Sequence, residues 1–204
     1  MTVRTHPAHD SSDPKQAVII HEAIDGAKAT DARDAHARAK EEEALERLSR
    51  AVISQARTRG ITIACAESLT AGMLASSLAG VSGASQVLLG GCVSYACAVK
   101  HKVLRVSAEI LDDPHQGPVS SYCSQQMARG AKQLMESDIA VSLTGIAGPT
   151  GALPGKPIGT VWICLAHQSG FICRCFHFSG DRTSVRMQAT HAALHMISTY
   201  LESL

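Results

Sequence analysis

A serine at the end of a predicted strand is the first residue of this chain that could do covalent chemistry. Ser68 stands in the stretch "TIACAESLTAG", where an apolar segment ends in the polar pair Glu67-Ser68 before a run of small residues. Ligands of α/β sheets bind beyond the carboxyl ends of the strands, and Ser68 is in that position. A nucleophilic serine also needs a base to take its proton. Because serine is equally a favoured helix N-cap, this stretch alone leaves both roles open.

The candidates for that base lie in the stretch "SYACAVKHK". Lys100 is surrounded in sequence by Ala, Val and Cys, which would desolvate its amine, lower its pKa and make the neutral form available. Tyr95 would relay a proton between Lys100 and Ser68, or form a hydrogen bond to both. His101 is the rival base, because the unperturbed pKa of histidine is near neutral. The spacing does not decide between Lys100 and His101.

Two further stretches could hold an anionic group of a ligand. The first, "TGIAGPTGALPGKPIGT" at residues 144–160, is a strand that runs into a Gly/Pro loop whose backbone N–H groups could bind phosphate or carboxylate, with Lys156 adding positive charge. It matches neither standard nucleotide-binding loop, so a plain connection is the alternative. The second is "SGDRTSVR", where Arg182 near a helix N-terminus would clamp a phosphate and Asp181 or Thr183 would cap the helix. A surface capping box without a ligand is the alternative there.

The elements that must position these residues follow from hydrophobic periodicity and from Gly and Pro. Helices and strands alternate before a final hairpin, which predicts an α/β domain, a three-layer α/β/α sandwich with a mixed sheet of about five strands. Gly90 and Gly91 would mark a bulge or a close backbone approach in the second strand. The predicted helices are 41–60, 70–79, 96–104, 119–135 and 183–203, and the predicted strands are 61–65, 86–95, 138–145, 158–167 and 171–178.

Charge divides the chain into two parts. Residues 1–48 contain 10 acidic and 7 basic residues, whereas the 156 residues that follow contain only 8 acidic and 12 basic residues. We therefore predict a disordered or loosely helical extension over residues 1–40 and a domain over residues 41–204. The histidines of the extension are irregularly spaced and do not indicate a metal site.

Composition also limits the partners and the compartment. The net charge of +1 argues against a nucleic-acid partner. No apolar run approaches the 18 or more residues of a membrane span, and no apolar signal core is present, so we expect a cytoplasmic protein without a membrane partner. The 7 cysteines are odd in number and form no CxxC motif, which favours reduced thiols over disulfides or a metal site.

Taken together, the motifs resemble a known family. The stretches "AESLTAG", "VSYACAVK", "GPVS…MARGA", "SLTGIAGPTGALPGKPIGTVW" and "SGDRTSVR" occur in the order found in the C-terminal domain of the competence/damage-inducible CinA family, the nicotinamide-nucleotide amidohydrolases. The resemblance covers residues 43–204. It implies hydrolysis of nicotinamide mononucleotide to nicotinic acid mononucleotide and ammonia, without a cofactor or metal.

The resemblance also implies roles for individual residues. The serine, tyrosine and lysine of the family fall on Ser68, Tyr95 and Lys100. Backbone N–H groups after Ser68 are candidates for binding the oxyanion. The parts expected to bind substrate are Glu67, Thr144, Gly145, Ala147, Gly148 and Arg182, of which Glu67 would orient backbone or bind ribose and Arg182 would hold the 5′-phosphate.

The chain also departs from the family pattern. Where the family often has a polar Asn-Glu pair before the lysine, this chain has Cys97 and Ala98, which removes a carboxylate and favours a neutral Lys100. The alternative function is a non-catalytic nucleotide-binding or protein-interaction module linked to competence or DNA damage. We expect a homo-oligomer, because the domain is small and poor in charge.

Overall fold

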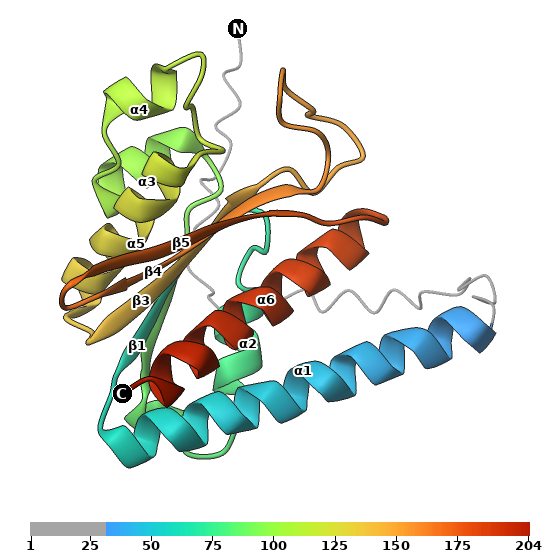
Figure 1. Ribbon diagram of the computed structural model, residues 1–204, viewed down its shortest axis with the longest axis vertical. Coiled ribbons are helices and arrows are strands. Elements are labelled where there is room, and N and C mark those ends of the chain that lie inside the picture. Colours follow the sequence, from blue (N-terminus) through green and yellow to red (C-terminus); the bar gives the residue numbers. More distant parts are fainter. Residues whose placement is uncertain (1–31) are drawn as a thin grey trace, which may run out of the picture.

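The computed structural model describes residues 32–204, with side chains from residue 39 onward (Figure 1). The predicted extension over residues 1–40 lies largely outside the described residues. Its last part belongs to the first helix, α1 (Ala32–Arg59), which begins well before the predicted helix at residue 41. Gly60 follows this helix with a left-handed φ of 66°, a conformation that favours glycine.

The remaining elements agree in order and type with those predicted, with two short helices, η1 and α4, as additions. The strands are β1 (Ile63–Glu67), β2 (Leu88–Val93), β3 (Ile139–Gly145), β4 (Thr160–His167) and β5 (Gly170–His177). The other helices are α2 (Met73–Ala79), the short 3₁₀ helix η1 (Ala84–Gln86), α3 (Cys97–Leu104), α4 (Ala108–Asp112), α5 (Ser121–Met135) and α6 (Arg182–Glu202).

The five strands form one mixed sheet in the order β2-β1-β3-β4-β5. The β1 strand pairs in parallel with β2 and with β3, whereas β3–β4 and β4–β5 are antiparallel. The prediction of an α/β fold with a mixed five-stranded sheet is therefore confirmed. Because β1, β2 and β3 run in the same direction, their carboxyl ends meet at one edge of the sheet, where Ser68 lies.

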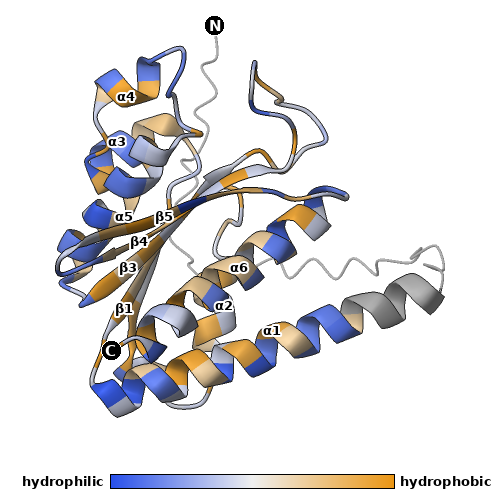
Figure 2. Cartoon of the chain, in the orientation of Figure 1, coloured by the Kyte–Doolittle hydropathy of each residue, from blue (hydrophilic) through white to orange (hydrophobic). Residues whose placement is uncertain are grey.

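Helices cover both faces of the sheet (Figure 1). On one side α1, α2 and α6 pack on a core of large aliphatic residues such as Leu143, Ile163 and Leu194. On the other side α5 packs on small residues of the sheet such as Ala64, Ala66 and Ala140, and α3 and α4 pack on α5. The apolar residues therefore gather in the strands and between the layers (Figure 2). Small residues on the second face let α5 approach closely, and α5 in turn sets the position of α3.

Both features predicted for Gly90 and Gly91, a bulge and a close approach of neighbouring atoms, are found in β2. The register of β1 against β2 shifts between Ile63 and Ala64, opposite this part of β2. A Cβ atom at Gly91 would lie 2.9 Å from the Cβ of Ala75 in α2, and one at Gly90 would lie 3.2 Å from the sulfur of Met135. These two positions therefore admit only glycine without movement of a neighbour.

The expectation of reduced thiols is wrong for one pair of cysteines. Cys164 and Cys173 form a disulfide bond, while the other five cysteines are free. The hairpin register places Cys164 of β4 directly opposite Cys173 of β5, a relationship that spacing along the sequence does not reveal. Within residues 32–204, no helix is long and apolar enough to cross a membrane. The same residues contain no cluster of three or more side chains suited to holding a metal ion.

Candidate active site

Ser68 and Lys100 meet at the edge of the sheet where β1 and β2 end. Ser68 is the first residue after β1, and Lys100 lies on α3, the helix that follows β2. The Nζ atom of Lys100 lies 2.9 Å from the Oγ atom of Ser68, 2.6 Å from the carbonyl oxygen of Ser94 and 3.3 Å from that of Tyr95. Only 1% of Lys100 is exposed. The structure therefore joins a serine hydroxyl to a buried amine, which is the arrangement that a lysine base requires.

The surroundings of Lys100 favour its neutral form. Burial lowers the pKa of the Lys100 amine from its ordinary value of 10.5, and the nearby thiols of Cys123, Cys97 and Cys92 oppose this effect in part. Among the described residues, Lys100 takes part in no ion pair, since the two ion pairs found there join exposed side chains of α1. A buried amine without a counter-ion loses its proton more easily than an amine in water.

The three contacts of Lys100 also match the hydrogen-bonding capacity of a neutral amine. A neutral amine has two N–H groups, which can donate to the carbonyl oxygens of Ser94 and Tyr95. Its lone pair then remains to accept the hydroxyl proton of Ser68 across the 2.9 Å contact. The same geometry serves the charged form, in which all three N–H groups donate. Proton transfer between Ser68 and Lys100 therefore requires no rearrangement of the site.

Ser68 is not the N-cap of a helix, so that alternative is wrong. The α2 helix begins five residues later at Met73, and its N-cap residue is Gly72. Glu67 satisfies the first N–H groups instead. Its buried carboxylate accepts hydrogen bonds from the backbone N–H groups of Gly72, Leu74 and Ala75, at 3.0, 3.1 and 2.8 Å. Of its two predicted roles, Glu67 therefore orients backbone, and the hydroxyl of Ser68 is left for Lys100.

Residues 68–72, which we call the Ser68 turn, present two free backbone donors. The N–H of Ser68 itself donates to the carbonyl oxygen of Leu143 at 2.9 Å. The next two N–H groups, of Leu69 and Thr70, donate no hydrogen bond to any described residue. Ala71 follows with a φ of 51°, a left-handed value that costs energy in a residue other than glycine. Of these two donors, the Leu69 N–H belongs to a residue that lines the cavity described below and is suited to binding an oxyanion, whereas Thr70 is fully buried.

Tyr95 and Arg182 form the rim of the site. The hydroxyl of Tyr95 accepts a hydrogen bond from Nη2 of Arg182 at 2.9 Å, and Nη1 of Arg182 donates to the carbonyl oxygen of Gly148 at 3.1 Å. The Tyr95 side chain is 58% exposed and does not reach Ser68 or Lys100 in this structure. Its predicted position between those two residues is therefore not the one observed, although its carbonyl group contacts Lys100.

The loop after β3 contributes backbone N–H groups to the site, whereas the side chains at its start are used in packing and internal hydrogen bonds. Thr144 is buried and donates its hydroxyl proton to the carbonyl oxygen of Pro118 at 2.6 Å. Gly145 packs against β4, because a Cβ atom there would lie 2.5 Å from the carbonyl oxygen of Thr160. The N–H groups of Ala147 and Gly148 donate no hydrogen bond within the described residues, so they are available to an anion.

Two other residues singled out in the sequence lie outside the site. The amine of Lys156 donates to the carbonyl oxygens of His115 and Gln116, at 2.8 and 2.5 Å, and so links two loops. The ring of His101 contacts the carbonyl oxygen of Val106 at 2.7 Å, and His101 does not line the cavity that contains Ser68. The structure therefore favours Lys100 over His101 as the base.

These groups line a cavity of about 210 Å³. Its lining includes Ser68 and Leu69 after β1, Cys97 and Lys100 of α3, Tyr95 just before that helix, and Arg182 of α6. The remaining lining residues are Pro118, Val119, Thr144, Gly145 and Ala147. A serine, a buried amine, free N–H donors and an arginine in one small cavity can support acyl transfer on a substrate that carries an anionic group.

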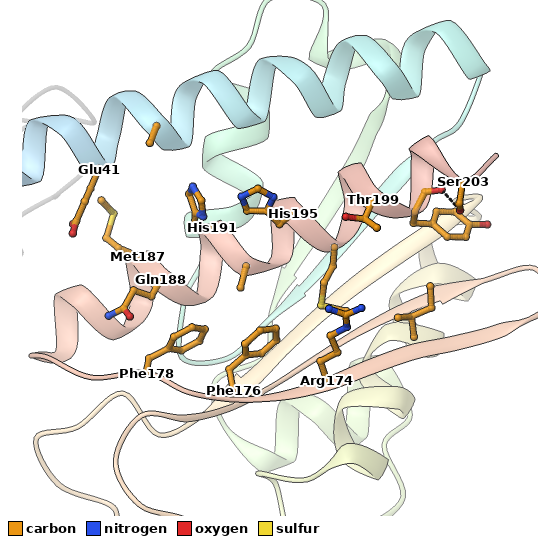
Figure 3. A pocket seen from close by; sticks show the side chains of 15 residues that line it. Glu41, Arg174, Phe176, Phe178, Met187, Gln188, His191, His195, Thr199 and Ser203 are labelled. Carbon is orange, nitrogen blue, oxygen red and sulfur yellow. Dashed lines mark hydrogen bonds between the residues drawn. The ribbon is translucent and has the colours of Figure 1, made fainter.

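A larger cavity of about 590 Å³ lies elsewhere, along the flank of α6 between β5 and α1 (Figure 3). Phe176 of β5 and Phe178, which directly follows this strand, project toward α6, and His191 and His195 lie along α6 (Figure 3). None of the predicted site residues lines this cavity. Among its lining residues, no hydroxyl group is hydrogen-bonded to a basic side chain, in contrast to Ser68 and Lys100, so its size alone does not make it the active site.

The sequence reasoning missed one residue that contacts the Ser68 turn. Arg186 donates from Nη2 to the carbonyl oxygen of Thr70 at 2.9 Å. The signal was present in "SGDRTSVR", because Arg186 follows Arg182 by four residues and so lies on the same face of α6.

Comparison with known proteins identifies the family of this chain. The model of the CinA C-terminal domain matches residues 45–201 of the chain. This chain belongs to the CinA family. CinA-like proteins of Thermotoga neapolitana and Syntrophotalea carbinolica are 40% and 41% identical to it over 157 and 145 residues, or 77% and 71% of this chain. The matched regions make up 38% and 35% of those two relatives, so the chain corresponds to little more than a third of their length.

Solved structures of the CinA superfamily share the fold. A competence-damaged protein (CinA) superfamily protein from Klebsiella pneumoniae has a TM-score of 0.75 and 31% identity, covering 78% of this chain and 99% of its own. The competence/damage-inducible protein from Agrobacterium tumefaciens has a TM-score of 0.74 and 32% identity, covering 78% of this chain and 96% of its own. The domain described above is therefore the CinA C-terminal fold.

Proposed function

We propose that this CinA-family protein is an amidohydrolase that converts nicotinamide mononucleotide to nicotinic acid mononucleotide and ammonia. The observation that carries the proposal is the 2.9 Å contact between the buried Lys100 amine and the Ser68 hydroxyl. A serine activated by a neutral lysine is suited to attack on a carboxamide carbon. The family resemblance supplies the particular amide.

In the first half of the reaction, the Ser68 oxygen forms a bond to the carboxamide carbon while its proton passes to the Lys100 amine. The carbonyl oxygen of the substrate becomes an oxyanion, and the free N–H group of Leu69 can donate to it. The carbon–nitrogen bond then breaks, and the proton held by Lys100 goes to the departing ammonia. The product of this half is an ester of Ser68 with the nicotinoyl group.

The second half repeats the first with water. Lys100 takes a proton from a water molecule, whose oxygen attacks the ester carbon. The Ser68 oxygen leaves and regains the proton from Lys100, which restores the starting state. Tyr95 has the predicted role of assisting these transfers, which would require its hydroxyl to turn from Arg182 toward Ser68. No step needs a metal or an organic cofactor.

The rim of the cavity suits the nucleotide part of the substrate. Arg182 is exposed and is held by Gly148 and Tyr95, so its guanidinium group can pair with a 5′-phosphate. The free N–H groups of Ala147 and Gly148 lie in the loop that Arg182 contacts and can add donors. The cavity of about 210 Å³ fits the flat nicotinamide ring at Ser68 with the phosphate toward the opening.

The direct test is ammonia release from nicotinamide mononucleotide by wild type and Ser68→Ala. We expect Ser68→Ala to lose several powers of ten in kcat while keeping its fold, as judged by circular dichroism. Ser54→Ala, at an exposed position of α1, is the matched control and should keep wild-type turnover. Wild-type turnover in Ser68→Ala would refute the nucleophile. A wild-type protein that binds the nucleotide in a thermal-shift assay but releases no ammonia would favour the non-catalytic module.

A further inference from the structure

A contact between α6 and the Ser68 turn is not accounted for by the proposed mechanism. Arg186 reaches from the second turn of α6 and donates from Nη2 to the carbonyl oxygen of Thr70 at 2.9 Å. The same carbonyl oxygen accepts the N–H of Met73 at 3.2 Å. Thr70 is fully buried, and its own N–H is one of the two free donors that follow the serine. Arg186 thus holds the residue that follows the free N–H donor of Leu69, and neither Arg186 nor Thr70 lines the substrate cavity.

The Ser68 turn is held from two directions by groups of opposite charge. The carboxylate of Glu67 accepts the N–H groups of Gly72, Leu74 and Ala75, on the side where α2 begins. The guanidinium group of Arg186 donates to a carbonyl group of the turn from the side of α6. Charge-assisted hydrogen bonds are about twice as strong as neutral ones. Together they can hold the left-handed conformation of Ala71, which has a φ of 51°.

The contact between Arg186 and Thr70 leaves buried polar atoms of both side chains without a hydrogen-bond partner in the described part of the chain. Within the described residues, three buried side-chain polar atoms have no hydrogen-bond partner, and two of them are Thr70 Oγ1 and Arg186 Nε. A buried polar atom without a partner is unfavourable and calls for a specific reason. A methionine or leucine at position 186 would avoid the cost. The arginine is therefore better explained by what it does to the turn than by the stability that it adds.

We infer that Arg186 is a positioning residue, which orients the Ser68 turn so that the N–H group of Leu69 binds the oxyanion. This inference rests on the proposed function, because the reaction in which the oxyanion forms is the hydrolysis proposed above. It assigns different tasks to the two arginines on one face of α6: Arg182 serves the rim of the cavity and Arg186 serves the turn beneath it. The reaction of Ser68 with any acyl or phosphonyl group should therefore depend on Arg186.

The first experiment is steady-state ammonia release from nicotinamide mononucleotide by Arg186→Ala and Arg186→Lys. We expect Arg186→Ala to lose a factor of about 10² to 10³ in kcat, the loss seen when an oxyanion donor is removed, with KM changed by less than about threefold. Added guanidinium ion, at concentrations well below those that unfold the protein, should restore part of kcat in Arg186→Ala and none in Ser68→Ala. Arg186→Lys keeps a single donor and should fall between wild type and Arg186→Ala. The matched control is Arg174→Ala, at an exposed position of β5, and should behave as wild type.

The second experiment separates this inference from the choice of substrate. A fluorophosphonate forms a bond from its phosphorus atom to the Ser68 oxygen, releases fluoride and leaves the serine proton on Lys100. We expect wild type to be labelled, Ser68→Ala to remain unlabelled, and Arg186→Ala and Arg186→Lys to be labelled more slowly in the same order as their kcat values. If wild type is labelled but releases no ammonia, the proposed substrate is wrong, and the labelling rates still decide the role of Arg186.

The outcomes that would overturn the inference are equally specific. Labelling of either Arg186 variant at the wild-type rate would show that the turn keeps its geometry without the guanidinium group. Thermal unfolding under assay conditions would measure the fraction of unfolded protein in each variant. If the loss in kcat equals the loss of folded protein, Arg186 contributes only to stability. If Arg186→Ala does not fold, Arg186→Lys is judged alone by the same two criteria.

Discussion

The amine of Lys100 and the hydroxyl of Ser68 lie 2.9 Å apart although 32 residues separate them in sequence. They meet because β1 and β2 are adjacent parallel strands, so that the segments leaving their carboxyl ends begin side by side. Ser68 directly follows β1, and Lys100 lies on the helix after β2. The pair is thus a direct product of sheet order. Lys100 is buried and, among the described residues, has no carboxylate beside it, so its amine loses a proton more easily than an amine in water.

Activity should rise with pH through the pKa of Lys100. Only the neutral amine can accept the Ser68 proton, and burial lowers the pKa of Lys100 below its ordinary value of 10.5. The rising limb of kcat/KM against pH should therefore have its midpoint below 10.5. Lys100→Arg should lose this limb along with most activity, because a guanidinium group does not deprotonate in this range. Lys102→Met, at an exposed position of the same helix, should keep the wild-type profile. A limb unchanged in Lys100→Arg would assign the base elsewhere.

The Glu67 carboxylate should matter more for stability than a surface carboxylate does. It accepts three backbone hydrogen bonds in a buried position, so Glu67→Gln should lower the free energy of unfolding by about 2 kcal/mol, as measured by urea denaturation. Glu43→Gln removes one partner of an exposed ion pair with Arg47 and should cost less than about 0.5 kcal/mol. Equal effects of the two substitutions would contradict the structural role assigned to Glu67.

A methyl group at Gly130 should disturb the helix that carries Lys100. A Cβ atom there would lie 2.0 Å from the carbonyl oxygen of Leu104, at the end of α3. Because α3 must then move away from α5, we expect Gly130→Ala to lose about 1–3 kcal/mol of stability and to lose activity as well. Gly80→Ala meets nothing closer than 3.5 Å at a helical φ of −65° and should lose neither. Thermal unfolding and ammonia release would measure the two effects, and a fully active Gly130→Ala would argue against tight coupling of α3 and α5.

Removal of the Arg182 guanidinium group should affect substrates according to their phosphate. Arg182→Ala should raise KM for nicotinamide mononucleotide by about tenfold or more, which is the loss of one charge-assisted contact with phosphate. For nicotinamide riboside, which has no 5′-phosphate, the same variant should change kcat/KM by less than about threefold. An equal loss on both substrates would indicate that Arg182 acts through Tyr95 or Gly148 rather than through the phosphate.

The sequence predicted the elements well because their signals are local. The alternation of strands and helices, the hairpin and Gly60 at the end of α1 all follow from periodicity and from single residues. Ser68 and Lys100 can be predicted as site residues for the same reason, because each is a polar residue next to an apolar segment. What periodicity did not resolve was the choice between Lys100 and His101, which depends on the direction in which each side chain leaves α3.

The features that the sequence did not predict depend on long-range geometry. The Cys164–Cys173 disulfide follows from the hairpin register, and the contact between Tyr95 and Arg182 joins residues 87 positions apart. The sequence predicted that Glu67 orients backbone, but not that it accepts the N–H groups at the start of α2, because this requires α2 to begin at Met73 rather than at the predicted residue 70. A shift of three residues at one helix end thus changes the interpretation of both Glu67 and Ser68.

The two arginines of α6 have a consequence for the order in which the site is completed during synthesis. Chains emerge from the ribosome with the N-terminal part first. A nascent chain that has reached β5 already holds Ser68, Lys100 and the whole sheet, but neither the guanidinium group that borders the cavity nor the one that holds the Ser68 turn. Under the proposed function, the nucleophile and its base are therefore synthesised before the two arginines to which we assign substrate binding and positioning. Docking of α6, the last described element, is then the step that completes the proposed site.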